Sequence, residues 1–268
     1  MLQQSTEAVV ATGFDPFAGP ALSARLPLTE SQREIWLAMQ MHPEAAVAYN
    51  EGIALSLSGV LNMTALRGAL DDLVARHELL RAGISPNGHW ITVNEPGACA
   101  LGMHEGTLEA AELEEMSTPF DLERGPAVRF RLVRLAAQEH VLLMVAHHIM
   151  VDGWSQATLM RELGELYSAR AVRAPIELGP ASFQEYVEAE AAFLESDEGR
   201  RHVGWWLEQL DAAPAIPQLP QDLASPPRRS YAAGRCDLDL DPALYQRVRQ
   251  LGAKSGVSYV ATALAASS

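Results

Sequence analysis

The sequence predicts an α+β fold in which helices pack against sheets built from hairpins. Three observations lead to this prediction. Segments with apolar residues three and four positions apart alternate with short apolar runs, which indicates helices interspersed with strands. Two pairs of these runs are joined by short turn sequences, as is typical of hairpins. The chain has 268 residues and is 48% hydrophobic, which is ample for a core.

The first elements follow a segment without periodicity. Residues 1–25 are rich in Ala, Gly, Pro, Ser and Thr, so we expect a linker or flexible tail there. Thr29 followed by Gln32 is a capping-box pattern and predicts the start of a helix. A strand is expected over residues 53–57, and a helix with regularly spaced leucines over residues 62–77.

Two hairpins and a short helix complete the predicted first lobe. The apolar runs 80–84 and 89–93 flank a Ser-Pro-Asn-Gly turn and predict the first hairpin. An acidic helix is expected over residues 108–116. The second hairpin pairs residues 128–135 with residues 140–146, of which 141–146 form a short continuous apolar run of the kind found in buried strands.

The composition changes near residue 174 and suggests the domain organisation. Residues 26–173 form the predicted N-terminal lobe, and residues 174–229 are punctuated by prolines around one helical stretch over 182–210. We therefore interpret residues 174–229 as a segment that crosses between two lobes. Residues 230–268 then begin a second lobe, of which we expect the first strand and helices.

Charge and cysteine content narrow the class of function. The net charge is −14, with 20 basic and 34 acidic residues, which argues against nucleic acid or an anionic membrane as a partner. Cys99 and Cys236 fit neither a disulfide framework nor a zinc site, which favours the cytoplasm. We find no apolar run in the sequence that is long enough to span a membrane. We also find no signal peptide and no glycine-rich nucleotide-binding loop.

The strongest chemical signal is a pair of histidines after the last predicted strand. His147 and His148 are followed by Asp152 and Gly153, and a helix is predicted from Ser155 onward, so the pair lies on a loop between strand and helix. A neutral imidazole accepts a proton near pH 7 more readily than other unperturbed side chains. Adjacent side chains of an extended segment point to opposite faces, which disfavours chelation of one metal ion by both rings.

The pattern His-His-x-x-x-Asp-Gly resembles the active-site motif of acyltransferases with the chloramphenicol-acetyltransferase fold. Trp154 and Ser155 directly after it point to condensation domains of nonribosomal peptide synthetases. The resemblance runs from about Leu26 to the last residue and implies an α/β sandwich lobe like that of chloramphenicol acetyltransferase, followed by an inter-lobe crossing segment. Further segments resemble other motifs of this family in the same order, namely residues 28–36, 76–81, 119–129, 183–186, 205–210 and 219–220.

One departure from the family concerns length. Members continue through most of a second lobe, whose floor loop and latch have no counterpart in this sequence. Residues 259–266 resemble the start of a helix without a glycine or proline stop signal after it. We therefore expect an amino-terminal half of a condensation domain, with an incomplete second lobe and no activity of its own.

The resemblance assigns roles to the residues of the motif. It places His148 in the substrate channel as the catalytic residue and gives His147 a mainly structural role. It further implies that Asp152 forms a buried salt bridge with an arginine, for which Arg81 and Arg76 are the candidates, since an unpaired buried carboxylate is costly.

The residues around the motif have plainer expected roles. We expect Gly153 to adopt a backbone conformation closed to other residues, Trp154 to pack, and Ser155 to cap the helix that follows. The paired aromatic residues later in the chain are expected to be core. They are Phe183 and Tyr186, and Trp205 and Trp206.

The implied reaction joins two substrates held as thioesters on the phosphopantetheine arms of donor and acceptor carrier domains, which belong to neighbouring synthetase modules. His148 would position the attacking amine and accept its proton, and no metal or bound cofactor is required.

Three alternatives to this function remain. Epimerisation domains share the histidine motif but place Ser-Trp where this chain has Trp154 and Ser155. The others are a stand-alone acyltransferase that uses soluble acyl thioesters and a noncatalytic carrier-docking fragment.

Overall fold

The computed structural model describes residues 22–176, 178, 182–211, 224, 231, 233–234 and 238–267. The chain forms two compact units, residues 1–230 and 231–268, which are described separately below. Several sequence features lie outside the described residues: most of the expected tail, Cys236, the motif at 219–220, and the prolines at 180, 214, 217, 220, 226 and 227.

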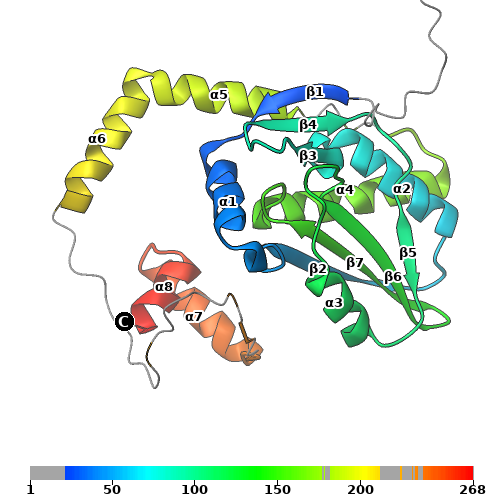
Figure 1. Ribbon diagram of the computed structural model, residues 1–268. Helices are drawn as coiled ribbons and strands as arrows, with labels where there is room; N and C mark the ends of the chain where they lie inside the picture. Colours follow the sequence, from blue (N-terminus) through cyan, green and yellow to red (C-terminus); the bar gives the residue numbers. More distant parts are fainter. Residues whose placement is uncertain are drawn as a thin grey trace, which may run out of the picture. The chain divides into compact units, whose positions relative to one another are not determined.

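The larger sheet of the first unit delivers the histidine loop. Its strands are β2 (Asn50–Ser58), β7 (Glu139–His147), β6 (Val128–Ala136) and β5 (Leu101–His104), in the order β2-β7-β6-β5 (Figure 1). β7 is central and runs antiparallel to β2 and β6, which confirms the predicted second hairpin. β5 pairs in parallel with β6 and was not predicted.

Strand β7 is buried on both faces, which explains its continuous apolar sequence. Val141 and Leu143 join a cluster with Val133 of β6 and Ala111 of α3 (Leu108–Ser117), so α3 covers one face of the sheet. Leu142 and Met144 point to the opposite face and are also buried. The strand therefore ends at a fixed place, with His147 as its last residue and His148 directly after it.

The smaller sheet contains the first predicted hairpin. It consists of β1 (Leu22–Pro27), β4 (Trp90–Asn94) and β3 (Ala82–Ile84), all antiparallel, in the order β1-β4-β3. The expected linker over residues 1–25 is therefore wrong at its end, because residues 22–25 belong to β1. The strand exists because it pairs with β4, a contact distant in sequence that local composition does not reveal.

Helices α1 (Glu30–Met41) and α2 (Met63–Arg76) of the first unit begin where the sequence predicts. Thr29 and Gln32 form both hydrogen bonds of the capping box at the start of α1. Asn62 caps α2 by accepting a hydrogen bond from the backbone N–H of Ala65 at 3.0 Å. α2 lies against α4 (Gly153–Val172), the helix that follows the histidine loop. Short 3-10 turns occupy Pro43–Ala45 and Glu78–Arg81.

The helical stretch expected over 182–210 consists of two helices, α5 (Phe183–Glu195) and α6 (Asp197–Asp211), separated at Ser196. The expectation that its aromatic residues are core is wrong. Tyr186, Trp205 and Trp206 are 55%, 53% and 58% exposed. Phe183 is only partly buried. An apolar face becomes core only where another element covers it, and the described residues provide no such cover here.

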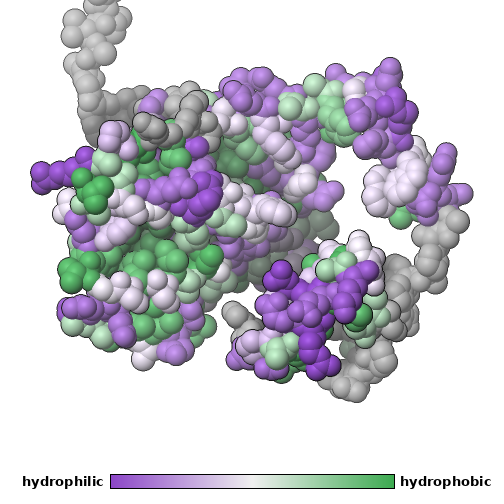
Figure 2. Space-filling view, turned by 180° about the vertical axis from the view of Figure 1, so that it is seen from behind, coloured by the Kyte–Doolittle hydropathy of each residue, from purple (hydrophilic) through white to green (hydrophobic). Residues whose placement is uncertain are grey.

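The second unit contains α7 (Pro242–Lys254) and α8 (Tyr259–Ser267). Asp241 caps α7 through the backbone N–H of Leu244 at 3.1 Å. The strand expected at the start of this unit is not formed by residues 238–240, which have no pairing partner among the described residues. The face of this unit seen in Figure 2 is largely hydrophilic. Across the described parts of both units, none of the helices is long and apolar enough to cross a membrane.

Candidate functional site

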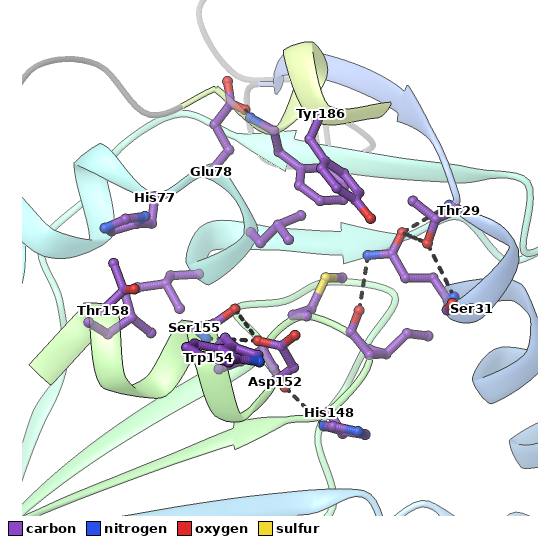
Figure 3. A pocket seen from close by; sticks show the side chains of 18 of the residues that line it. Thr29, Ser31, His77, Glu78, His148, Asp152, Trp154, Ser155, Thr158 and Tyr186 are labelled. Carbon is purple, nitrogen blue, oxygen red and sulfur yellow. Dashed lines mark hydrogen bonds between the residues drawn. The ribbon is translucent and has the colours of Figure 1, made fainter. Parts of the chain in front are cut away.

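The loop after β7 forms part of the wall of a pocket in the first unit (Figure 3). The pocket has a volume of about 740 Å³. Three further segments contribute to it: the start of α1, the turn Glu78–Arg81 after α2, and the first turn of α5. Its polar lining comes from Thr29, Ser31, Gln32, His77, Glu78, His148, Asp152, Ser155, Thr158, Ser182 and Tyr186.

The backbone of the histidine loop is held at several points. The N–H of His147 donates to the carbonyl of Ala127 at 3.0 Å, and the N–H of His148 donates to the carbonyl of Tyr49 at 2.8 Å. The side-chain amide of Gln32, in the first turn of α1, donates to the carbonyl of Ile149 at 3.0 Å. These bonds fix where the two imidazoles leave the sheet.

His147 lies in the protein interior. The residue is 1% exposed, and its ring lies 5.9 Å from the ring of Tyr49 and 6.3 Å from that of Phe120, between centroids. Its Nδ1 accepts a hydrogen bond from the backbone N–H of Ile149 at 3.2 Å. Burial lowers the pKa of His147 to about 4, an effect that the backbone of Ala46 opposes and the neighbouring His148 reinforces. The ring is therefore neutral at pH 7.

His148 has a different environment, at the rim of the pocket. Its side chain is 37% exposed. Nδ1 lies 2.9 Å from Oε1 of Glu51 and 3.1 Å from the carbonyl oxygen of Val151. Both partners are acceptors, so Nδ1 carries the proton and the lone pair of the neutral ring is on Nε2. Within the described part of the chain, Nε2 has no hydrogen-bond partner.

Asp152 does not form the expected salt bridge. The residue is exposed, and its Oδ1 accepts hydrogen bonds from the backbone N–H of Ser155 at 2.7 Å and from the Ser155 hydroxyl at 2.6 Å. These hydrogen bonds hold the pKa of Asp152 below its usual value. Asp152 is thus the N-cap of α4, and the expectation that Ser155 is the cap is wrong as well.

The two candidate arginines are engaged elsewhere. Nε of Arg76 lies 2.8 Å from Oε2 of Glu162, a buried carboxylate of α4 that is also 2.7 Å from Nε2 of His77. Arg81 donates through Nη1 to the backbone carbonyl of Asn94 and lines a second pocket of about 640 Å³. The buried carboxylate that Arg76 pairs with is therefore Glu162 of α4, whereas Asp152 is exposed.

Two further expectations about the motif are wrong. Gly153 is the first residue of α4 and does not have a positive φ, so its backbone conformation is open to other residues. A Cβ at Gly153 would meet no atom within 4 Å, which leaves room beside the loop. Trp154 was expected to pack, yet it is 87% exposed at the pocket.

Glu51 and Gln156 belong to the site but were not predicted from the sequence. The side-chain amide of Gln156 donates to Oε2 of Glu51 at 2.8 Å, while Oε1 of Glu51 contacts His148. Glu51 lies in β2 opposite Ala146 of β7, next to the histidine pair. A charged residue at the start of a strand is an ordinary feature, and only the pairing of β2 with β7 shows that this one reaches the motif.

This arrangement provides an imidazole nitrogen with a free lone pair beside a pocket with polar walls. Such a nitrogen can accept a proton from a bound amine or hydroxyl group. Three or more potential ligands for a metal ion do not occur together anywhere in the described residues.

Comparisons with known proteins agree with these features. The profile of the family described as Condensation domain matches residues 23–268. A protein of Salinispora arenicola described as a probable non-canonical nonribosomal peptide synthetase is 32% identical over 256 residues, which cover 89% of this chain and 3% of the synthetase. The chain therefore spans a small part of such a relative.

Solved structures of condensation domains and X-domains are also similar to this chain. The X-domain from teicoplanin biosynthesis is 30% identical, with a TM-score of 0.72 over 87% of this chain and 54% of that chain. The first condensation domain of the calcium-dependent antibiotic synthetase, solved with a substrate analogue, is 26% identical, with a TM-score of 0.62 over 72% of this chain and 49% of that chain. Since the family profile covers nearly all of the sequence, this chain belongs to the condensation domains of nonribosomal peptide synthetases.

Proposed function

We propose that this domain takes part in forming an amide bond between a donor acyl or peptidyl thioester and the amine of an acceptor aminoacyl thioester, each tethered to a carrier domain. The observation that carries the proposal is Nε2 of His148, which bears a lone pair at a pocket while Nδ1 is held by two acceptors. Membership of the condensation-domain family supplies the reaction class.

In the proposed reaction the acceptor amine attacks the carbonyl carbon of the donor thioester. The C–N bond forms, and Nε2 of His148 accepts a proton from the amine. The tetrahedral intermediate then collapses, the C–S bond breaks, and the donor arm leaves as a thiolate that takes up a proton. Because an amine attacks a thioester readily, holding the two groups together contributes much of the rate.

The roles of the other motif residues follow from their contacts. We propose that His147 is structural, because it is buried and neutral. Asp152 would act by starting α4, and thereby fixing the loop, rather than by binding Arg81 or Arg76. Trp154 is exposed at the pocket, which suits a contact with a bound substrate or its arm.

The proposed partners are donor and acceptor carrier domains in the cytoplasm, which bring their own phosphopantetheine arms. The chain covers about half of the solved condensation and X-domain chains that it matches. In this chain the apolar residues of α5 and α6 are largely exposed. We therefore expect the 268-residue chain by itself to form no measurable amide, because a site that must hold two arms loses its orientation advantage without a complete channel.

The similarity to the X-domain favours a second candidate function. Another solved structure is described as a complex of that X-domain with OxyB, and it is 29% identical, with a TM-score of 0.71 over 90% of this chain. A noncatalytic docking function is therefore the alternative to amide formation. It predicts binding of a partner without any dependence on His148.

The experiment loads the carriers of the parent synthetase with donor and acceptor and quantifies the joined product by mass spectrometry. Product formed from loaded carriers, but not from soluble acyl thioesters of the same donor, is the expected result. Equal use of soluble thioesters would instead identify a stand-alone acyltransferase. Partner binding without product in any combination would identify a docking module.

A further inference from the structure

We propose that Glu51 is a positioning residue for His148, and that its carboxylate, itself fixed by Gln156, holds Nδ1 so that Nε2 faces the reacting amine. The catalytic consequence of this inference rests on the proposed function. The geometry that supports it, however, can be measured without any reaction.

The contacts of Glu51 place its carboxylate between two elements. Oε1 lies 2.9 Å from Nδ1 of His148, on the loop after β7, and Oε2 accepts a hydrogen bond at 2.8 Å from the amide of Gln156, in the first turn of α4. The side chain of Glu51 is 33% exposed, so the contact is only partly screened by water. The amide thus restricts the rotamer of the carboxylate, and the carboxylate restricts the imidazole.

A carboxylate at Nδ1 has two chemical effects. It requires the neutral ring to carry its proton on Nδ1, which leaves the lone pair on Nε2, and it stabilises the positive charge that appears when Nε2 accepts a proton. The carbonyl of Val151, 3.1 Å from Nδ1, favours the same tautomer but carries no full charge. Glu51 therefore supplies an electrostatic contribution that Val151 cannot replace.

The other ionisable groups around His148 do not take over this role. Asp152, at the cap of α4, interacts electrostatically with His148, but its Oδ1 is bound to Ser155. His147, on β7, is buried and neutral at pH 7. Of the carboxylates in the described residues, Glu51 alone is within hydrogen-bonding distance of the His148 ring.

The first test is spectroscopic and uses the 268-residue chain. Imidazole ¹⁵N chemical shifts distinguish the two neutral tautomers, and His148→Ala identifies the His148 signals among the eight histidines. We expect the Nδ1–H tautomer in the unmodified chain and a more mixed population in Glu51→Ala and in Gln156→Leu. The matched control is Glu165→Gln, which removes an exposed carboxylate of α4 that pairs with Arg161. An unchanged tautomer in Glu51→Ala overturns the proposal.

The second test is kinetic and uses the parent synthetase. Glu51→Gln keeps the shape of the side chain and removes its charge, and we expect the rate of amide formation to fall about 10-fold, as is common when a group that orients a functional histidine is altered. Glu165→Gln should leave the rate unchanged.

The two tests separate failure of this inference from failure of the proposed function. If His148→Ala retains full activity in the parent, the catalytic proposal fails, while the tautomer measurement still decides whether Glu51 positions the ring. If His148→Ala is inactive but Glu51→Gln forms the amide at the wild-type rate, Glu51 is not a positioning residue.

Discussion

Two neighbouring histidines at the end of β7 lie on opposite sides of the chain, in very different surroundings. On the buried side, His147 lies against Tyr49 and Phe120 and is 1% exposed. On the pocket side, His148 contacts Glu51 and the carbonyl of Val151 and is accessible to solvent. Because consecutive side chains leave an extended chain in opposite directions, one position of shift separates a core residue from a candidate catalytic one.

The comparison predicts which substitution damages the fold most. His147→Ala should lower the free energy of unfolding by about 2–5 kcal/mol, since it leaves a cavity in a closely packed region. His148→Ala should lower it by less than about 1 kcal/mol, because the side chain and its contacts with Glu51 and Val151 are partly exposed. Urea denaturation of both variants gives the two values. A larger loss in His148→Ala would reverse the assignment of the two sides.

The next largest loss of stability is expected in acid and comes from His147 on the buried side. The pKa of His147 is lowered from 6.5 to about 4, so the unfolded chain binds a proton there that the folded chain does not. The stability that the neutral His147 ring contributes is complete above pH 6.5. It is lost as the pH falls toward 4, by about 3 kcal/mol in all. Urea denaturation at pH 7 and pH 4.5 measures the loss.

The control for the acid effect is His147→Gln, a side chain that does not titrate. Carboxylates contribute equally to the variant and to the original chain, so the difference between the two isolates His147. His148→Ala should keep most of the acid effect, because burial is its main cause. If His147→Gln loses as much stability in acid as the original chain does, the buried imidazole is not the cause.

On the pocket side, substitution of Asp152 should lower stability moderately, because Asp152 caps α4. Asp152→Ala should cost about 1 kcal/mol, whereas Asp152→Asn should cost much less, because Asn is an equally good N-cap residue. Thermal denaturation compares the two variants. A salt bridge to Arg81 or Arg76 would instead make Asn as damaging as Ala, so equal losses would restore the rejected pairing.

The smallest effect on stability is expected at Trp154. The indole is 87% exposed, so Trp154→Ala should change the free energy of unfolding by less than about 0.5 kcal/mol. Denaturation of this variant beside Asp152→Ala, its neighbour on the same loop, checks the value. A loss above 1 kcal/mol would mean that the side chain packs in solution.

Much of the fold follows from local sequence. The capping box of Thr29 and Gln32, the cap at Asn62 and the turn at Gly88 depend on a few neighbouring residues, and these elements begin and end close to the predicted positions. The position of the histidine pair between strand and helix follows in the same way, because an apolar run and a helical pattern flank it, although His147 is the last residue of β7 and only His148 lies on the loop. Local signals of this kind suffice wherever the partner of a group is within a few residues.

The rest depends on partners that are distant in the sequence. Glu162 binds Arg76 across 86 residues, and Glu51 binds Gln156 across 105, so neither pairing follows from a local pattern. Likewise, the spacing of Trp205 and Trp206 indicates an apolar face but not what covers it. Asp152 looked like a buried ion because its burial was assumed, whereas the helix start places it at the surface.

The most direct test of the account is a single-turnover assay of His148→Ala in the parent synthetase with both carriers loaded. Amide formation should fall by about 10²–10⁴-fold, the range expected when a general base is removed, while the circular dichroism spectrum and the carrier loading stay unchanged. A folded, fully loaded His148→Ala variant that forms the amide at the wild-type rate would contradict the central claim.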